Sequence, residues 1–133
     1  NWHCLKTLID EQIYPSSHIK FTPNAKYLLQ SSLCNTIKLW DYLKGNIVKL
    51  YQGHQNEKFC IPSLFYGDDF VISGSEDNNL YVWDLQSQNI KQTLSDHNDV
   101  VLSCSTSKSL EMIASSSIKK DPSIIVYKLV TAT

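Results

Sequence analysis

The sequence predicts an all-β protein built from three similar units of four strands each. The pair Trp40-Asp41 recurs as Trp83-Asp84, 43 residues later, and Tyr127 follows after a further 44 residues. Segments of this kind, short and rich in β-branched and aromatic residues, are typical of strands. Turn-forming clusters with Gly, Pro, Asn or Asp separate many of them. A repeat, rather than a single irregular sheet, therefore organises the chain.

The first two units are each expected to supply an inner strand, two middle strands and an outer strand, and the third unit is expected to lack its outer strand. A leftover outer strand at 4–8 would precede the first unit, and all 133 residues would form one partial domain, with units at about 9–51, 52–94 and 95–133. The other expected strands are 18–21, 27–29, 37–40, 46–51, 60–65, 70–72, 80–83, 89–94, 100–104, 112–114 and 124–127.

Composition and charge exclude several classes of function. The formal net charge is -1, which gives no positive field for direct binding of nucleic acid. Apolar stretches such as 123–127 are far shorter than the roughly 18 residues that a membrane helix needs. The four cysteines contain no CxxC pair, so we expect free thiols and neither a metal site nor a cofactor.

Motifs of the middle unit resemble the WD repeat. They are Gly53-His54, the run 73–77 (Ser-Gly-Ser-Glu-Asp) and Trp83-Asp84, and the period of 43 lies within the roughly 40 to 45 residues of that repeat. The resemblance implies a β-propeller, here about three four-stranded blades of a ring that in the family commonly has seven. The chain is therefore expected to be a C-terminal portion of a longer propeller, either as a fragment or as a truncated gene product.

The family also has a polar network in each blade, in which a His, a strand Ser, a turn Asp and a Trp are joined by hydrogen bonds. The resemblance assigns this structural network to His54, Ser73, Asp77 and Trp83. Such bonding avoids the cost of leaving buried polar groups without partners.

The other two units depart from this pattern. The third unit keeps His97, Ser115 and Asp121 but has Tyr127 in place of the Trp, which implies a reduced network. The first unit has Cys34 at the Asp position, so packing alone is expected to hold it.

The same residue types could instead form a Ser-His-Asp catalytic triad. They recur at the repeat period, however, and no G-x-S-x-G elbow is present to expose a serine nucleophile. We therefore expect a protein that is not an enzyme.

A closer resemblance extends along nearly the whole chain. The segments 21–27, 35–42, 53–61 and 73–78 are similar to WD-repeat scaffold subunits of histone H3 lysine 4 methyltransferase complexes. This resemblance implies a nuclear, non-catalytic scaffold whose partners are protein subunits of such a complex, together with the histone H3 tail. A diverged WD-repeat adaptor of a ubiquitin ligase or a signalling assembly is the alternative, suggested by Cys34, Pro62 and Tyr127.

The resemblance implies two peptide sites on opposite faces of the ring. The first is an arginine pocket, whose matching positions are Ser17, Phe59, Cys60 and Pro62. The family has an aromatic ring at the position of Pro62, so arginine stacking would be weakened. The second is a groove for an acidic and apolar partner peptide, with matching positions Asn24, Tyr27, Leu39, Phe65 and Gln86.

Overall fold

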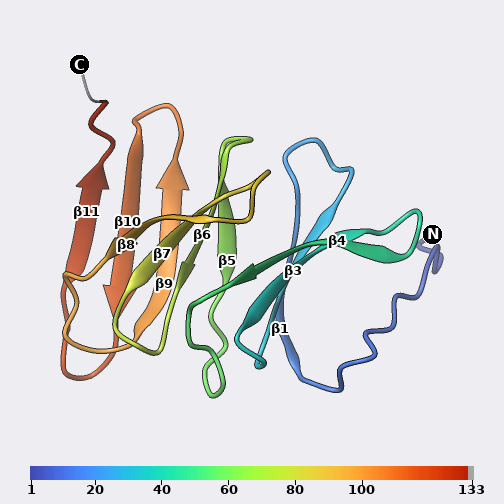
Figure 1. Ribbon diagram of the computed structural model, residues 1–133, viewed down its shortest axis with the longest axis horizontal. Coiled ribbons are helices and arrows are strands. Elements are labelled where there is room, and N and C mark those ends of the chain that lie inside the picture. Colours follow the sequence, from blue (N-terminus) through green and yellow to red (C-terminus); the bar gives the residue numbers. More distant parts are fainter. Residues whose placement is uncertain (132–133) are drawn as a thin grey trace.

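The computed structural model describes residues 1–131, which contain eleven strands and no helix (Figure 1). The all-β fold predicted from the sequence is therefore confirmed. The strands are β1 (Ser16–Phe21), β2 (Leu28–Ser32), β3 (Thr36–Asp41), β4 (Asn46–Gln52), β5 (Ser63–Tyr66), β6 (Phe70–Gly74), β7 (Leu80–Asp84), β8 (Ile90–Leu94), β9 (Val101–Ser107), β10 (Met112–Ser117) and β11 (Ile124–Lys128).

Consecutive strands pair antiparallel in three separate sheets. Strands β1 to β4 form blade 1, β5 to β8 form blade 2, and β9 to β11 form a three-stranded blade 3. Strands β1, β5 and β9 are each an edge strand of their own sheet, and β5 contacts both β1 and β9. This arrangement of sheets around neighbouring inner strands is that of adjacent propeller blades.

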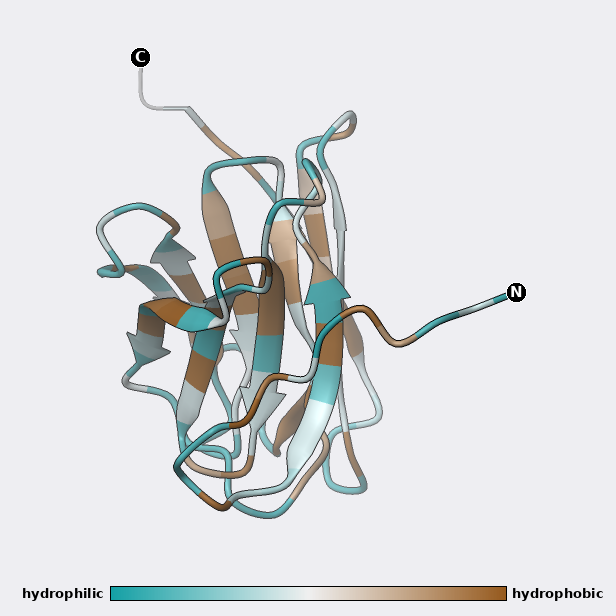
Figure 2. Cartoon of the chain, turned by 90° about the vertical axis from the view of Figure 1, so that its right-hand side faces the viewer, coloured by the Kyte–Doolittle hydropathy of each residue, from teal (hydrophilic) through white to brown (hydrophobic). Residues whose placement is uncertain are grey.

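The structure differs from the prediction at 4–8, because no strand is present in residues 1–15. A strand needs a neighbour that exchanges backbone hydrogen bonds with it, and residues 4–8 pair with none of the eleven strands. The segment instead runs across the outer face of blade 1, as Figure 2 shows. There Lys38 of β3 donates hydrogen bonds to the carboxylate of Asp10 and to the Gln12 side chain.

The inner strand of blade 2 is also shorter than predicted. It begins at Ser63, so Cys60, Ile61 and Pro62 lie in the preceding loop. Pro62 has no N–H to donate to a ladder, which explains why the strand begins one residue after it.

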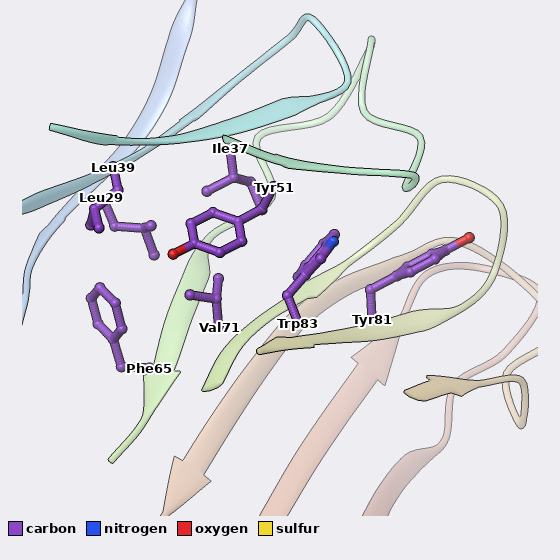
Figure 3. Close-up of a cluster of buried hydrophobic side chains, with 8 residues drawn as sticks. All are labelled: Leu29, Ile37, Leu39, Tyr51, Phe65, Val71, Tyr81 and Trp83. Atoms are coloured by element: carbon purple, nitrogen blue, oxygen red, sulfur yellow. The ribbon is translucent and has the colours of Figure 1, made fainter. Parts of the chain in front are cut away.

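The core lies between the blades. Between blades 1 and 2, side chains from both sheets form one cluster, consisting of Leu29, Ile37, Leu39, Tyr51, Phe65, Val71, Tyr81 and Trp83 (Figure 3). A second cluster between blades 2 and 3 contains Tyr66, Ile72, Leu80, Val82, Val101 and Cys104. At Gly74 the two backbones come so close that an added Cβ would lie 2.0 Å from the carbonyl oxygen of Val101. The blades therefore pack as face-to-face sheets.

Candidate functional site

A groove between blades 1 and 2 brings together four of the five residues that the sequence assigned to a peptide groove. Asn24, Tyr27, Leu39 and Gln86 line one cavity of about 350 Å³. The fifth residue, Phe65, is only 6% exposed and packs in the same core cluster as Leu39, as Figure 3 shows. Phe65 therefore supports the floor of the groove rather than lining it.

The wall on blade 1 is a turn held by side-chain hydrogen bonds. The hydroxyl of Thr22 donates to Asn24 Oδ1 (2.7 Å) and accepts from the backbone N–H of Tyr27 (3.0 Å). Asn24 Oδ1 also accepts from the N–H of Lys26 (3.0 Å). Because these bonds occupy the amide oxygen of Asn24, its NH₂ group is the part available to a ligand.

The wall on blade 2 is the turn after β7, which β4 holds in place. Lys49 Nζ donates to the carbonyl oxygen of Gln86 (2.7 Å), and the hydroxyl of Tyr51 donates to that of Leu85 (2.7 Å). Burial raises the pKa of Tyr51, so its hydroxyl remains a donor across the physiological range. These bonds hold the backbone of the turn, which places the exposed Gln86 side chain in the lining of the groove.

The residues assigned to an arginine pocket lie on two elements. Ser17 is in β1, where its hydroxyl donates to the carbonyl oxygen of Ser31 (3.3 Å). Phe59, Cys60 and Pro62 lie in the loop before β5, which is the strand beside β1. Pro62 supplies no aromatic ring here, so Phe59 is the aromatic side chain that this loop contributes.

The loop before β5 depends on a residue that the sequence analysis missed. The carboxylate of Glu76 accepts hydrogen bonds from the backbone N–H groups of Glu57, Lys58 and Phe59 (2.8 to 3.0 Å) and from the amide of Asn56 (3.0 Å). Burial alone would raise the pKa of Glu76, but these donors outweigh it and lower the pKa. Nothing in the local sequence signals this role, because the donors lie about 20 residues earlier in the chain.

The structural network is present in blade 3. His97 Nδ1 donates to Asp121 Oδ2 (2.8 Å), and in that neutral tautomer Nε2 accepts from the hydroxyl of Ser115 (2.8 Å). Hydrogen bonds from Ser123, from the N–H of Asn98 and from His97 hold the pKa of Asp121 well below its usual range. These buried groups bond to one another, so the arrangement stabilises the blade.

Blade 2 does not form the network that the sequence assigned to it. The hydroxyl of Tyr81 donates to the carboxylate of Asp77, and the hydroxyl of Ser73 donates to the carbonyl oxygen of Gly74 (2.9 Å). Trp83 Nε1 donates to the carbonyl oxygen of Gln52 (2.9 Å). His54 packs edge-on against Trp83, and within the described residues its Nδ1 has no hydrogen-bond partner. The hydrogen bond from Tyr81 occupies the carboxylate of Asp77, which explains why the assigned network is absent.

Blade 1 was expected to rely on packing alone, and this expectation is wrong. Trp40 Nε1 donates to Gln30 Oε1 (2.7 Å), and the amide of Gln30 donates to the hydroxyl of Ser16. Gln30 occupies the repeat position of Ser73, and its longer side chain reaches Trp40 within the same sheet. Cys34 contacts the hydroxyl of Ser32, 2.9 Å away.

Residues 1–131 lack two further kinds of feature. No group of three or more His, Cys, Asp or Glu side chains is placed to hold a metal ion. No helix in this range is long and apolar enough to span a bilayer.

Comparisons with known proteins agree with the repeat. Residues 2–41 and 45–84 each match the family described as WD40: WD domain, G-beta repeat. The chain is 33% identical over 108 residues to COMPASS component SWD3 of Saccharomyces cerevisiae. This alignment covers 69% of this chain and 34% of that protein. It is 40% identical over 81 residues to GID complex subunit 7 of Schizosaccharomyces pombe, covering 59% of this chain and 16% of that protein.

A third relative covers more of the chain. The WD repeat-containing protein WDS homolog of Arabidopsis thaliana is 32% identical over 117 residues, covering 84% of this chain and 22% of that protein. The chain thus spans between 16% and 34% of the length of these three relatives. Proteins built from this repeat are generally non-catalytic scaffolds that bind other proteins. With its period, its blades and these matches, the chain belongs to the WD40 repeat family.

Proposed function

We propose that the chain is part of a non-catalytic scaffold whose groove between blades 1 and 2 holds a short peptide of a partner protein. One observation carries this proposal. Asn24, Tyr27, Leu39 and Gln86 come from three separate segments of the chain, and all four line one cavity. Concave sites with apolar walls and a few convergent polar groups are typical of ligand sites.

The chemistry of the groove suits a peptide with apolar and acidic residues. Tyr27, Leu39 and Val48 offer apolar surface to an aliphatic side chain. The amide groups of Asn24 and Gln86 can bond to the backbone of an extended peptide. Lys49 supplies a cation beside them, and its interaction with Gln86 uses only one of its three N–H donors.

We propose that the scaffold acts in the nucleus within a histone H3 lysine 4 methyltransferase complex. The resemblance to WD repeat-containing protein 5 suggests this, and the similarity to COMPASS component SWD3 supports it. Protein subunits of that complex are the proposed partners at the groove, with the histone H3 tail as a partner at Ser17, Phe59 and Cys60. The groove is the stronger site, because Pro62 removes an aromatic ring from the other one.

A second candidate is an adaptor role in a different assembly. The identity of 40% to GID complex subunit 7 favours it, although that alignment covers a smaller share of the chain. Both candidates use the same groove and differ in the partner peptide.

Co-purification with separated subunits tests the groove and the assembly together. The tagged chain is incubated with subunits of a histone H3 lysine 4 methyltransferase complex and, separately, with GID complex subunits. Gln86→Glu removes the amide and places a negative charge beside the acidic residue of the peptide, and we expect it to weaken capture about tenfold, a loss of about 1.4 kcal/mol. Lys119→Ala, at an exposed lysine outside the groove, is the matched control.

The outcome for each assembly is separate. Capture of the methyltransferase subunits that Gln86→Glu weakens supports the first candidate, and capture of GID subunits alone supports the second. Capture that Gln86→Glu leaves unchanged would contradict the groove as the binding site.

A further inference from the structure

A second cavity, of about 330 Å³, lies between blades 2 and 3. Its lining occupies the repeat positions of the first groove. On the sheets, Tyr27, Leu39 and Val48 of the first groove correspond, 43 residues later, to Phe70, Val82 and Lys91 of the second.

The correspondence extends to the second blade of each interface. There the turn after β7 lines the first groove, and the segment after β11 lines the second cavity. Leu85 and Gln86 of the first groove correspond, 44 residues later, to Leu129 and Val130 of the second. The two cavities are therefore the same structural feature at successive blade interfaces, with different side chains.

The second cavity is the more apolar of the two at these positions. Phe70 replaces Tyr27 and Val130 replaces Gln86, so a phenol and an amide are lost. Lys91 replaces Val48, which adds a cation at the rim, and within residues 1–131 Lys91 forms no ion pair. The other charged groups in the lining are Lys128 and Glu111, which are 4.0 Å apart.

A buried hydroxyl in the lining lacks a partner. Tyr66 is 3% exposed, and within the described residues its hydroxyl makes no hydrogen bond. The Tyr66 ring is held between Phe70, at a centroid distance of 6.2 Å, and Lys108 Nζ, 4.7 Å from the ring centroid. A buried hydroxyl without a partner is costly, and a ligand atom that accepts a hydrogen bond from it would remove that cost.

We propose that this cavity is a second peptide-docking groove, which takes an apolar segment carrying one acidic residue. The aliphatic side chains of the segment would pack on Phe70, Val82 and Leu129. Its carboxylate would lie at Lys91, which forms no ion pair within residues 1–131, and a backbone carbonyl would accept a hydrogen bond from Tyr66. The site is additional to the proposed function and does not depend on the identity of the partner of the first groove.

The first test uses a fluorescein-labelled pentapeptide, Leu-Val-Leu-Asp-Leu, in anisotropy titrations with the full chain. Lys91→Glu and Val130→Glu place a negative charge beside the proposed carboxylate, and we expect each to weaken binding about tenfold or more. Lys119→Glu makes the same charge change outside the cavity and should leave binding unchanged. Absence of binding to the unmodified chain, or equal binding by all variants, would overturn the proposal.

The second test locates the probe, because the first groove could bind it as well. A version of the pentapeptide that carries a benzophenone is photo-crosslinked to the chain, and the products are digested and analysed by mass spectrometry. We expect adducts at Phe70 or in the segment 128–130. Adducts restricted to 22–27 and 85–86 would place the probe in the first groove and overturn the assignment.

The third test separates binding from structure at Tyr66. Tyr66→Phe removes the unpaired hydroxyl, so the melting temperature of the free chain should stay the same or rise, while the affinity for the probe falls. A lower melting temperature with unchanged affinity would show a structural role only.

Light scattering of the free chain tests self-association at the cavity. A dimer that Val130→Glu dissociates would assign the cavity to self-association instead.

Discussion

Two histidines at the same repeat position, His54 and His97, have different surroundings. His97 donates to Asp121, whereas the aspartate of the middle repeat, Asp77, accepts from Tyr81. The third repeat has Ile125 at the position of Tyr81, so no phenol competes with His97 for Oδ2 of Asp121, and the hydroxyl of Ser123 donates to the other oxygen, Oδ1. Burial is the largest cause of the low pKa of His54, about 4, and the nearby charges of Asp77 and Glu76 only partly oppose it.

This difference predicts how Tyr81→Phe changes the pKa of His54. Without the phenol, the carboxylate of Asp77 becomes available to the imidazole, so the pKa of His54 should rise above about 4. NMR titration of the histidine side chains measures it directly. An unchanged pKa of His54 would show that the hydrogen bond from Tyr81 does not keep Asp77 away from the imidazole.

The same pKa sets a pH dependence of stability. In the unfolded chain His54 titrates near about 6.5, and in the folded chain near about 4. Between these values only the unfolded state binds the proton, so stability is full above about pH 6.5 and falls as the pH decreases toward 4. The loss is up to about 3 kcal/mol, measurable by urea unfolding at several pH values, and it should be smaller in Tyr81→Phe.

At the scale of elements, the segment before β1 is held by one buried cation. The Lys38 side chain is 4% exposed, and its partner Asp10 lies on that segment. Burial would raise the pKa of Asp10, but hydrogen bonds from Lys38 and Gln12 outweigh this effect and lower it. The repeat pattern predicts a strand at 4–8 of this segment, whereas the structure has no strand there and holds the segment to β3 at Asp10.

Replacing one partner of this ion pair should lower the free energy of unfolding more than replacing both partners. Asp10→Asn leaves the Lys38 ammonium without a carboxylate, and we expect the free energy of unfolding to fall by about 2 kcal/mol. The double variant Asp10→Asn with Lys38→Met avoids a buried unpaired charge and should recover much of this loss. Urea unfolding of the two single variants and the double variant measures the coupling. Additive losses would contradict a specific pair.

At the scale of the whole molecule, the outer face of blade 3 is a packing surface without a covering sheet. Ile37 and Leu80 occupy one repeat position and are 1% and 0% exposed, whereas Ile124 at the same position is 74% exposed. At a second repeat position, Leu39 and Val82 are 2% and 9% exposed, whereas Val126 is 60% exposed. Large exposed apolar patches of this kind favour association.

The 133-residue chain should therefore self-associate through blade 3. Ile124→Lys removes apolar surface from the uncovered face and should increase the monomer fraction in sedimentation velocity experiments at micromolar concentration. Ile19→Lys, at an isoleucine of β1 that is 54% exposed, is the matched control and should have little effect. Equal gains from both variants would assign the effect to charge rather than to this face.

Much of the architecture follows from local signals in the chain. Strand positions, their antiparallel order and the three units come from residue types and a period of 43, because neighbouring strands in a blade are joined by short turns. Residues of the groove between blades 1 and 2 came from a family resemblance, and four of them share one cavity.

The partners of the polar side chains were decided only in three dimensions. Tyr81 competes for Asp77, Gln30 reaches Trp40, and Glu76 holds a loop that lies about 20 residues earlier. Lys38 likewise bonds to the side chains of Asp10 and Gln12 and holds that part of the chain on blade 1. A repeat period places side chains on faces, but hydrogen-bond partners depend on side-chain length and on the approach of other segments, which the period does not contain.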